Sequence, residues 1–256
     1  MKAKTIELNL IQENIKHLST DGLGTYIAVT SQNNIVAFCL ETPLHLGMEI
    51  IMVKIIDEEK ILIIVDQHNL IDNALIIDYN GNIKVRFTIG EHINDIKINA
   101  KKIIVSYFDQ GVLGNYGPNN DAVAVFNFKG QQLYGYNSNT TQEKLIDCYC
   151  LANMGNQRII FNGYGNFSLQ ELDLNTLHLT SYETPSQCIG AGSISAKAGN
   201  IIFHSTYKDK SSFFVWNLKS NEVYQIHSGF THITGTDNGV FYKVDKKSFI
   251  LIHPIE

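Results

Sequence analysis

The sequence has few charged residues, few cysteines and no long apolar run. Charged residues make up 18% of its 256 residues, below the ~25% typical of globular proteins, so Asn, Gln, Ser, Thr and Tyr must complete the surface. No apolar run approaches the ~18 residues that span a membrane, and Met1–Leu10 lacks the apolar core of a secretory signal. Four scattered cysteines are too few for a disulfide framework and agree with a reducing compartment. These absences predict a cytoplasmic protein with no membrane partner.

A basic segment is absent as well. The net charge is -5, and no stretch holds the run of Lys and Arg that would neutralise several phosphates, which argues against a nucleic-acid partner. The hydrophobic fraction of 44% excludes a disordered chain. A chain of this length buries roughly 70 to 75% of its unfolded surface without a disulfide or metal staple. We therefore expect a single domain that covers residues 1–256.

What the sequence does contain is a repeat of short alternating runs that end in a turn. Asp78, Asn127, Asp173 and Asn217 each end such a run, and they are spaced 49, 46 and 44 residues apart. An Asx residue followed by Gly or a polar residue between two period-2 runs is typical of a β-hairpin. Two further apolar runs precede each hairpin, which gives about four strands in ~43 residues, the size of a propeller blade. No window of 11 to 18 residues keeps the apolar stripe of a long helix.

Counting the copies predicts how the ring closes. Runs at residues 35–41 and 249–253 add an earlier and a later copy, so that six copies result. The last copy lacks its outermost strand, whereas the alternating run at residues 4–10 stands before the first complete blade. Pairing of these two segments would remove an open sheet edge. The sequence therefore predicts an all-β, six-bladed β-propeller with four antiparallel strands per blade, closed by an N-terminal strand in the last blade; five and seven blades are the alternatives.

One predicted loop between the second and third strands of a blade is much longer than the others. It covers residues 106–121, contains three glycines, and offers side-chain oxygens from Asp109, Asn115, Asn119, Asn120 and Asp121. Loops of this kind emerge around the central channel of a propeller, and a long loop between short strands is often functional. The loop could clasp a polar ligand or a hard cation. Alternatively, it could be an ordered cap whose Asp and Asn side chains bind the loop's own amides.

This loop and a later strand carry a family resemblance. Residues 107–117, together with residues 147–151, resemble an uncharacterised family of bacterial propeller-like proteins with a Tyr-Phe-Asp-Glu-Gly-x-x-Gly-Asn-x-Gly segment and a later Asp-Asp-Cys-Tyr-Ala-Leu segment. The sequence departs from these segments at Gln110, Ile146 and Cys150. The resemblance implies the fold and no activity. More remotely, residues 93–106 are similar to blades of the sugar-lactone lactonase class of six-bladed propellers, whose members use a metal at the channel mouth.

Two carboxylates are candidates for a site in the channel. Asp95 and Asp147, with Thr234, occupy comparable positions near the starts of predicted inner strands. Converging carboxylates could bind a divalent cation such as Ca²⁺, or one of them could have a raised pKa and act as a base. With Asp109 from the long loop they form the metal ligands of one hypothesis, a metal-dependent hydrolase or lyase of the lactonase-like class. The alternative is that each carboxylate accepts hydrogen bonds from neighbouring backbone.

Aromatic residues gather in or beside the predicted upper loops. Tyr-rich, weakly charged surfaces bury area at low entropic cost and suit protein or glycan contacts, although the same rings could also pack loop on loop. Our first hypothesis is a non-catalytic binding module without a cofactor whose partner is another protein, for example a bacterial toxin that an immunity protein neutralises. Its predicted contact residues are Tyr107, Phe108, Asp109, Asn115, Tyr116, Tyr149 and Tyr164.

Overall fold

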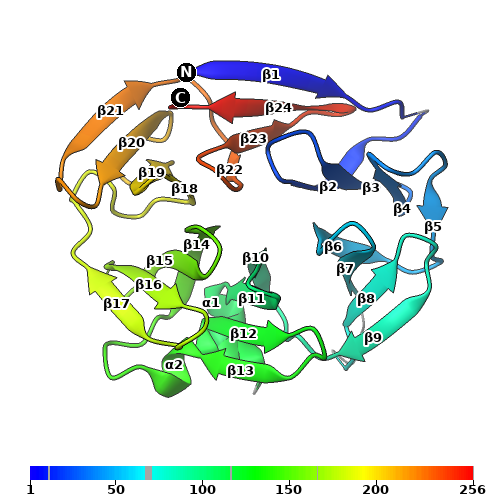
Figure 1. Cartoon of the computed structure of the whole chain (residues 1–256), viewed down its shortest axis with the longest axis horizontal. Coiled ribbons are helices and arrows are strands. Elements are labelled where there is room, and N and C mark those ends of the chain that lie inside the picture. Colours follow the sequence, from blue (N-terminus) through cyan, green and yellow to red (C-terminus); the bar gives the residue numbers. More distant parts are fainter. Residues whose placement is uncertain (11, 67–70, 116, 166, 256) are drawn as a thin grey trace.

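Six four-stranded antiparallel sheets surround a central axis in the computed structural model (Figure 1). The structure describes residues 1–10, 12–66, 71–115, 117–165 and 167–255. The predicted six-bladed β-propeller with four antiparallel strands per blade is confirmed. Within the described residues, no helix has the length and apolar character needed to cross a membrane.

In each sheet, the strands follow one another from the central axis to the outer edge in the order of a propeller blade. The innermost strands are β2 (Ile15–Thr20), β6 (Ile50–Ile55), β10 (Ile93–Asn99), β14 (Asp147–Asn153), β18 (Ser193–Lys197) and β22 (Thr234–Gly235). The second strands are β3 (Tyr26–Thr30), β7 (Lys60–Val65), β11 (Lys102–Tyr107), β15 (Arg158–Tyr164), β19 (Asn200–His204) and β23 (Phe241–Val244). The third strands are β4 (Asn34–Ala37), β8 (Ala74–Asp78), β12 (Val123–Asn127), β16 (Leu169–Asp173), β20 (Ser212–Asn217) and β24 (Ser248–His253). The outermost strands are β5 (Leu44–His45), β9 (Ile83–Phe87), β13 (Gln132–Gly135), β17 (Leu179–Tyr182), β21 (Val223–His227) and β1 (Lys2–Glu7).

The two ends of the chain close the ring. The first strand, β1, is the outermost strand of the last sheet, where Lys2 lies opposite His253 and Ile6 opposite Phe249 (Figure 1). The Phe249 ring also packs edge-on against Tyr26 of the first complete blade, at 5.8 Å between ring centroids. This sheet is consistent with the predicted closure by an N-terminal strand, because β1 covers the edge of β24 that would otherwise be open.

The repeated Asx residues work as the sequence predicts. In the turns between third and outermost strands, the Oδ1 atoms of Asp78, Asn127, Asp173 and Asn217 each accept hydrogen bonds from backbone amides two to four residues later. These side-chain oxygens therefore act as acceptors for backbone amides that a sharp turn leaves without a main-chain acceptor.

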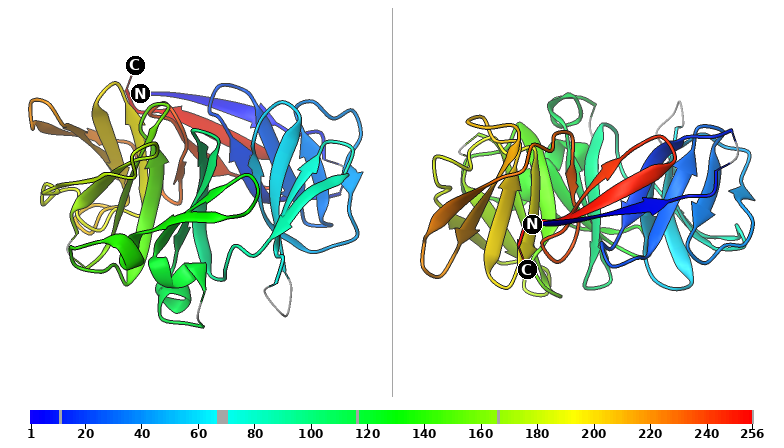
Figure 2. Two further views of the ribbon diagram at one scale, coloured as in Figure 1. Left: turned by 60° about the horizontal axis from the view of Figure 1, so that its bottom comes forward. Right: turned by 90° about the horizontal axis from the view of Figure 1, so that it is seen from above.

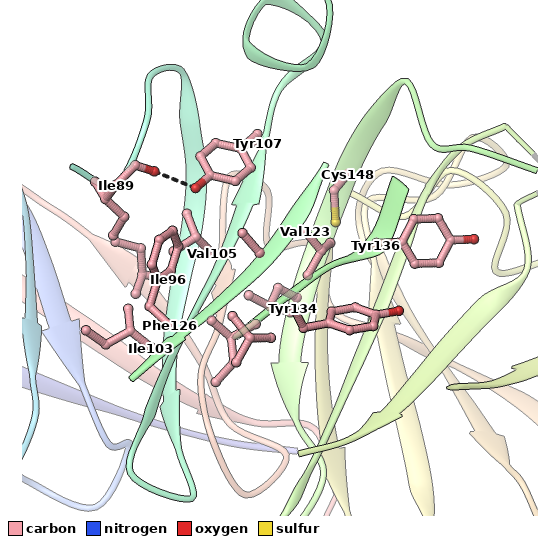
Figure 3. Close-up of a cluster of buried hydrophobic side chains, with 14 of the residues drawn as sticks. Ile89, Ile96, Ile103, Val105, Tyr107, Val123, Phe126, Tyr134, Tyr136 and Cys148 are labelled. Atoms are coloured by element: carbon pink, nitrogen blue, oxygen red, sulfur yellow. Dashed lines mark hydrogen bonds between the residues drawn. The ribbon is translucent and has the colours of Figure 1, made fainter. Parts of the chain in front are cut away.

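The core lies between the blades rather than inside one sheet. Second strands are covered on both faces by neighbouring blades, so β7 reads as a continuous apolar run and residues 61–65 are all buried. The largest buried cluster joins the second, third and fourth complete blades. Figure 3 shows part of it, with Phe126 and Tyr136 on opposite sides of the cluster.

The connections from second to third strands and from outermost to innermost strands emerge on one face, which we call the upper face. The longest of these connections contains a short α-helix, α1 (Asp109–Val112), and a 3-10 helix, η1 (Pro118–Asp121). A second short helix, α2 (Tyr136–Asn139), follows β13. Figure 2 shows the flat disc of the blades from the side, with the loop that contains α1 protruding from the disc.

Candidate functional site

Large apolar side chains are exposed along one side of the upper face. Five of them come from connections around the third, fourth and fifth complete blades, and we call them the upper rim: Phe108, Leu113, Ile146, Tyr164 and Tyr207. Leu113 is 71% exposed and Tyr207 57%. The backbone amide of Ile146 donates to the carbonyl of Tyr164, so these two side chains come from adjoining backbone. The upper face therefore exposes five large apolar side chains, and clusters of such side chains often mark interaction sites.

Aromatic rings continue the upper rim towards the channel. Phe167 packs edge-on against both Tyr164 and Tyr207, at 5.5 and 6.1 Å between ring centroids. The hydroxyls of Tyr207 and Tyr149 are 2.7 Å apart, which links the rim to an inner strand. Gly190 fits under the Tyr207 ring, since its φ is +68° and a Cβ atom there would lie 2.4 Å from the ring. These contacts therefore hold the rings in a fixed arrangement.

The long loop is an ordered structure. Asn119, which is buried, donates from its amide to the carbonyls of Gly111 and Asn115, at 2.6 and 3.0 Å. Asn120 donates to the carbonyl of Val112 at 2.9 Å. Asp121 accepts from the Ser138 amide and from Gln132, which ties the loop to its own blade. These three side chains form hydrogen bonds within the loop and to its own blade, as the ordered-cap alternative predicts. Phe108 and Leu113 remain exposed.

The predicted contact residues divide into three groups. Phe108, Asp109, Asn115 and Tyr164 are exposed on the upper face, and Tyr149 is half-buried beside Tyr207. Tyr107 does not belong to this surface, because it is fully buried and its hydroxyl donates to the Ile89 carbonyl (Figure 3). Tyr116 lies outside the described residues. Sequence reasoning missed Leu113 and Ile146 as rim residues, although a large apolar residue inside a polar loop was the available signal.

The two channel carboxylates are not at equivalent positions. In four blades, the innermost strand carries a bulge where it pairs with the second strand. Asp95 is the first paired residue after the bulge in β10, and Cys150 holds that position in β14. Asp147 comes before the bulge and lies nearer the mouth of the channel. Because both strands carry the bulge at the same place, Asp147 corresponds to His92 rather than to Asp95, and the predicted equivalence of Asp95 and Asp147 is wrong.

Asp95 belongs to a buried ion cluster in the middle of the channel. Its Oδ1 atom lies 2.7 Å from Lys54 Nζ, and its Oδ2 atom lies 2.9 Å from Lys97 Nζ. Burial alone would raise the pKa of Asp95, but the two ammonium groups outweigh it and hold the pKa at about 2. Asp95 is thus a carboxylate already neutralised by two lysines, and a metal ion would have to displace them.

The ion cluster divides the channel into two cavities. The upper cavity, of about 320 Å³, is lined by residues from all six innermost strands, among them Lys54 and Asp95. The lower cavity, of about 230 Å³, is lined by Lys54 and Lys97 together with Asp237. Lys54 therefore borders both spaces.

Asp147 lies within the electrostatic reach of Asp109. One carboxylate oxygen of Asp147 is buried without a hydrogen-bond partner in the described part of the chain. Burial, and then the negative charge of Asp109, raise the pKa of Asp147 to about 6. Among the described residues, no group of three or more His, Cys, Asp or Glu side chains is placed to hold a metal ion. The three carboxylates of the metal hypothesis therefore lie at different depths and do not form one ligand set.

We expect Asp147→Asn to stabilise the protein at pH 8 by about 1 kcal/mol and to leave its stability at pH 4 unchanged. A shift of two pKa units would be worth up to about 3 kcal/mol, reduced here because solvent reaches part of the side chain. The folded-state pKa lies above that of the unfolded chain, so this group favours folding below pH ~4 and loses that contribution as the pH rises through 6. Urea unfolding at both pH values measures the effect. Equal changes at pH 4 and pH 8 would contradict it, and Asp109→Asn should give a smaller change of the same sign.

Comparisons with known proteins support the fold. No protein-family model and no curated protein matches the sequence. Among solved structures, YCF48 bound to D1 peptide is similar with a TM-score of 0.58 and 12% identity, over 99% of this chain and 82% of that chain. The WD40 β-propeller domain of Doa1 gives 0.54 and 9%, over 96% and 94%. A catalytically inactive virginiamycin B lyase from Staphylococcus aureus with quinupristin gives 0.51 and 13%, over 98% and 100%. The lyase and the WD40 domain thus both share this fold, but their sequence identities to this chain are too low to indicate its activity.

Proposed function

We propose that the protein is a non-catalytic binding module that docks another protein on its upper rim. The observation that carries the proposal is the exposure of Phe108, Leu113, Ile146, Tyr164 and Tyr207 on the upper face. Large aromatic and aliphatic side chains in a fixed arrangement are the usual anchors of protein interfaces. A bacterial toxin that this protein neutralises as an immunity protein is one partner of this kind.

Two further observations support docking at this site. The long loop and the Tyr207 ring are held by Asn119 and Gly190, so little conformational entropy would be lost when a partner binds. YCF48, a propeller of similar fold, is bound to a peptide in its structure. The other hypothesis, a metal-dependent hydrolase or lyase, has less support because Asp95 is occupied by two lysines and lies at a different depth from Asp147.

The double variant Leu113→Ser/Tyr164→Ser is expected to reduce partner retention by at least tenfold. Interface anchors typically contribute 2 kcal/mol or more, which corresponds to about 30-fold in affinity. Immobilised wild-type protein and variant would be exposed to a lysate of the native host, and the retained proteins quantified by mass spectrometry.

The matched control for this experiment is Leu133→Ser/Tyr224→Ser. These side chains are exposed to a similar degree but lie on the outermost strands β13 and β21. Because all four residues are exposed, both variants should remain within about 0.5 kcal/mol of wild-type stability. The proposal is overturned if wild-type protein retains no partner, or if rim and control variants retain it equally.

A further inference from the structure

We infer that the upper cavity of the channel is a binding site for a carboxylate group, which the ammonium of Lys54 holds. This site is separate from the upper rim. It rests on the geometry of the buried ion cluster and on the shape of the cavity above it.

The first step is the unequal bonding of the two lysines. Lys97 donates both to Asp95, at 2.9 Å, and to the carbonyl of Gly235, at 2.9 Å. Lys54 donates to Asp95 Oδ1 at 2.7 Å, and the described residues offer its ammonium no second acceptor. An ammonium group has three N–H donors, so Lys54 keeps donors for which the protein supplies no partner.

The second step is that Asp95 is already shared among three donors. Its Oδ1 atom accepts from Lys54 and also from the Ile96 amide at 2.7 Å, while Oδ2 accepts from Lys97. The directly bonded cluster therefore contains two buried cations and one anion, while a further carboxylate, Asp237, acts on both lysines through space. The Lys54 side chain is 13% exposed, so water compensates little of its charge. Burial and the charge of Lys97 lower the pKa of Lys54, and Asp95 and Asp237 offset this only in part. The same two carboxylates raise the pKa of Lys97 above its ordinary value despite burial.

The third step is the cavity itself. It opens to the upper face and has a volume of about 320 Å³, at the small end of the range for ligand pockets. The innermost strand β22 has only two residues, so Tyr242 and Val244 of the second strand behind it also line the cavity. Asn94, Tyr149 and Thr234 add polar groups to the walls.

These features together select the ligand chemistry. The deepest unsatisfied group is a single buried cation, and a monoanion with two acceptor oxygens matches it in charge and in number of donors. The volume suits a small organic acid or one acidic side chain and is too small for a nucleotide. A carboxylate could therefore come from a free metabolite, or from an Asp or Glu side chain of a protein docked above the channel.

The test uses the whole protein and simple probes. Formate, acetate and propionate would be titrated at constant ionic strength, with chloride and phosphate as comparison anions, and binding followed by amide chemical shifts and calorimetry. We expect the carboxylates to bind and chloride and phosphate not to bind. Acetylated Gly-Glu-Gly and Gly-Gln-Gly peptides form the second arm. Tighter binding of the Glu peptide than of acetate identifies a protein side chain as the source, and the reverse identifies a free acid.

Two variants locate the site. Lys54→Met is expected to weaken carboxylate binding about tenfold or more, because charged hydrogen bonds are lost. Thr234→Phe should abolish binding by filling the upper cavity, without touching the ion cluster. Its matched control is Ser19→Phe, which places the same ring in the lower cavity and should leave binding unchanged. Thr234→Phe keeps the test valid if Lys54→Met does not fold.

The inference is overturned if no carboxylate binds the wild-type protein, if phosphate or chloride binds as well as acetate, or if Thr234→Phe binds normally. None of these probes requires the upper rim. A failure here therefore leaves the partner-retention experiment untouched, and a failure of partner retention leaves the carboxylate site untouched.

Discussion

Deletion of residues 1–10 is expected to lower the free energy of unfolding by about 5 kcal/mol or more and the melting temperature by at least ~10 °C. The deletion removes β1, which pairs with β24 from Lys2 to Glu7, and also the buried side chains of Leu8 and Leu10. Without β1, the backbone of β24 becomes an open sheet edge, so the truncated protein should also aggregate. Circular dichroism melts and light scattering measure the two effects.

A synthetic peptide of residues 1–10, added to the truncated chain, should restore most of the lost stability. The control is Lys4→Thr/Glu7→Thr in the full chain. Both side chains are exposed, and the backbone pairing to β24 is retained, so the change should stay within about 0.5 kcal/mol. A truncated protein that melts at the wild-type temperature would show that the two ends contribute nothing to ring closure.

The second large effect is expected from Asp95→Asn. This substitution removes the carboxylate that pairs directly with the buried ammonium groups of Lys54 and Lys97, and the loss of one partner of a buried ion pair typically costs about 3 to 5 kcal/mol. Replacement of all three residues, as Lys54→Met/Asp95→Leu/Lys97→Met, should recover most of that loss, because a well-packed apolar cluster avoids the cost of burying charges. Urea unfolding at pH 7 compares the three proteins.

The pH dependence gives an independent check of the same cluster. The folded-state pKa of Asp95, about 2, lies below its value of 3.8 in an unfolded chain. The stabilisation by this group is therefore complete above pH ~4 and disappears as the pH falls towards 2. The stability difference between wild type and Asp95→Asn should shrink over that interval. A difference that stays constant from pH 5 to pH 2 would mean that Asp95 is not ionised in the folded protein.

The blade architecture could be predicted from the sequence because each blade leaves a local signal. The Asx residues at 78, 127, 173 and 217 mark one turn per blade, and their side chains form the expected hydrogen bonds. The missing outer strand of the last copy similarly pointed to the alternating run at the N-terminus. Both inferences need only the order of short elements along the chain.

The site was less accessible to this reasoning because it depends on contacts between blades. Lys54 and Asp95 are 41 residues apart, and no local pattern indicates that their side chains meet. A lysine within the apolar segment 50–55 was a weak signal of a polar channel wall. Asp147 lies three positions before the strand position that Asp95 occupies, which only the pairing of the strands reveals, and burial of Tyr107 followed from a core that joins several blades. Three-dimensional packing decides each of these points.

Ring closure also imposes an order on synthesis. The ribosome makes β1 well before β24, so the first strand has to wait for its partner until almost the whole chain has emerged. The strand is suited to that delay, since five of its six side chains remain exposed even in the finished protein and only Ile6 is partly covered. Five blades can therefore assemble cotranslationally from neighbouring segments, whereas the sixth is completed only after the nascent chain has delivered its last strand.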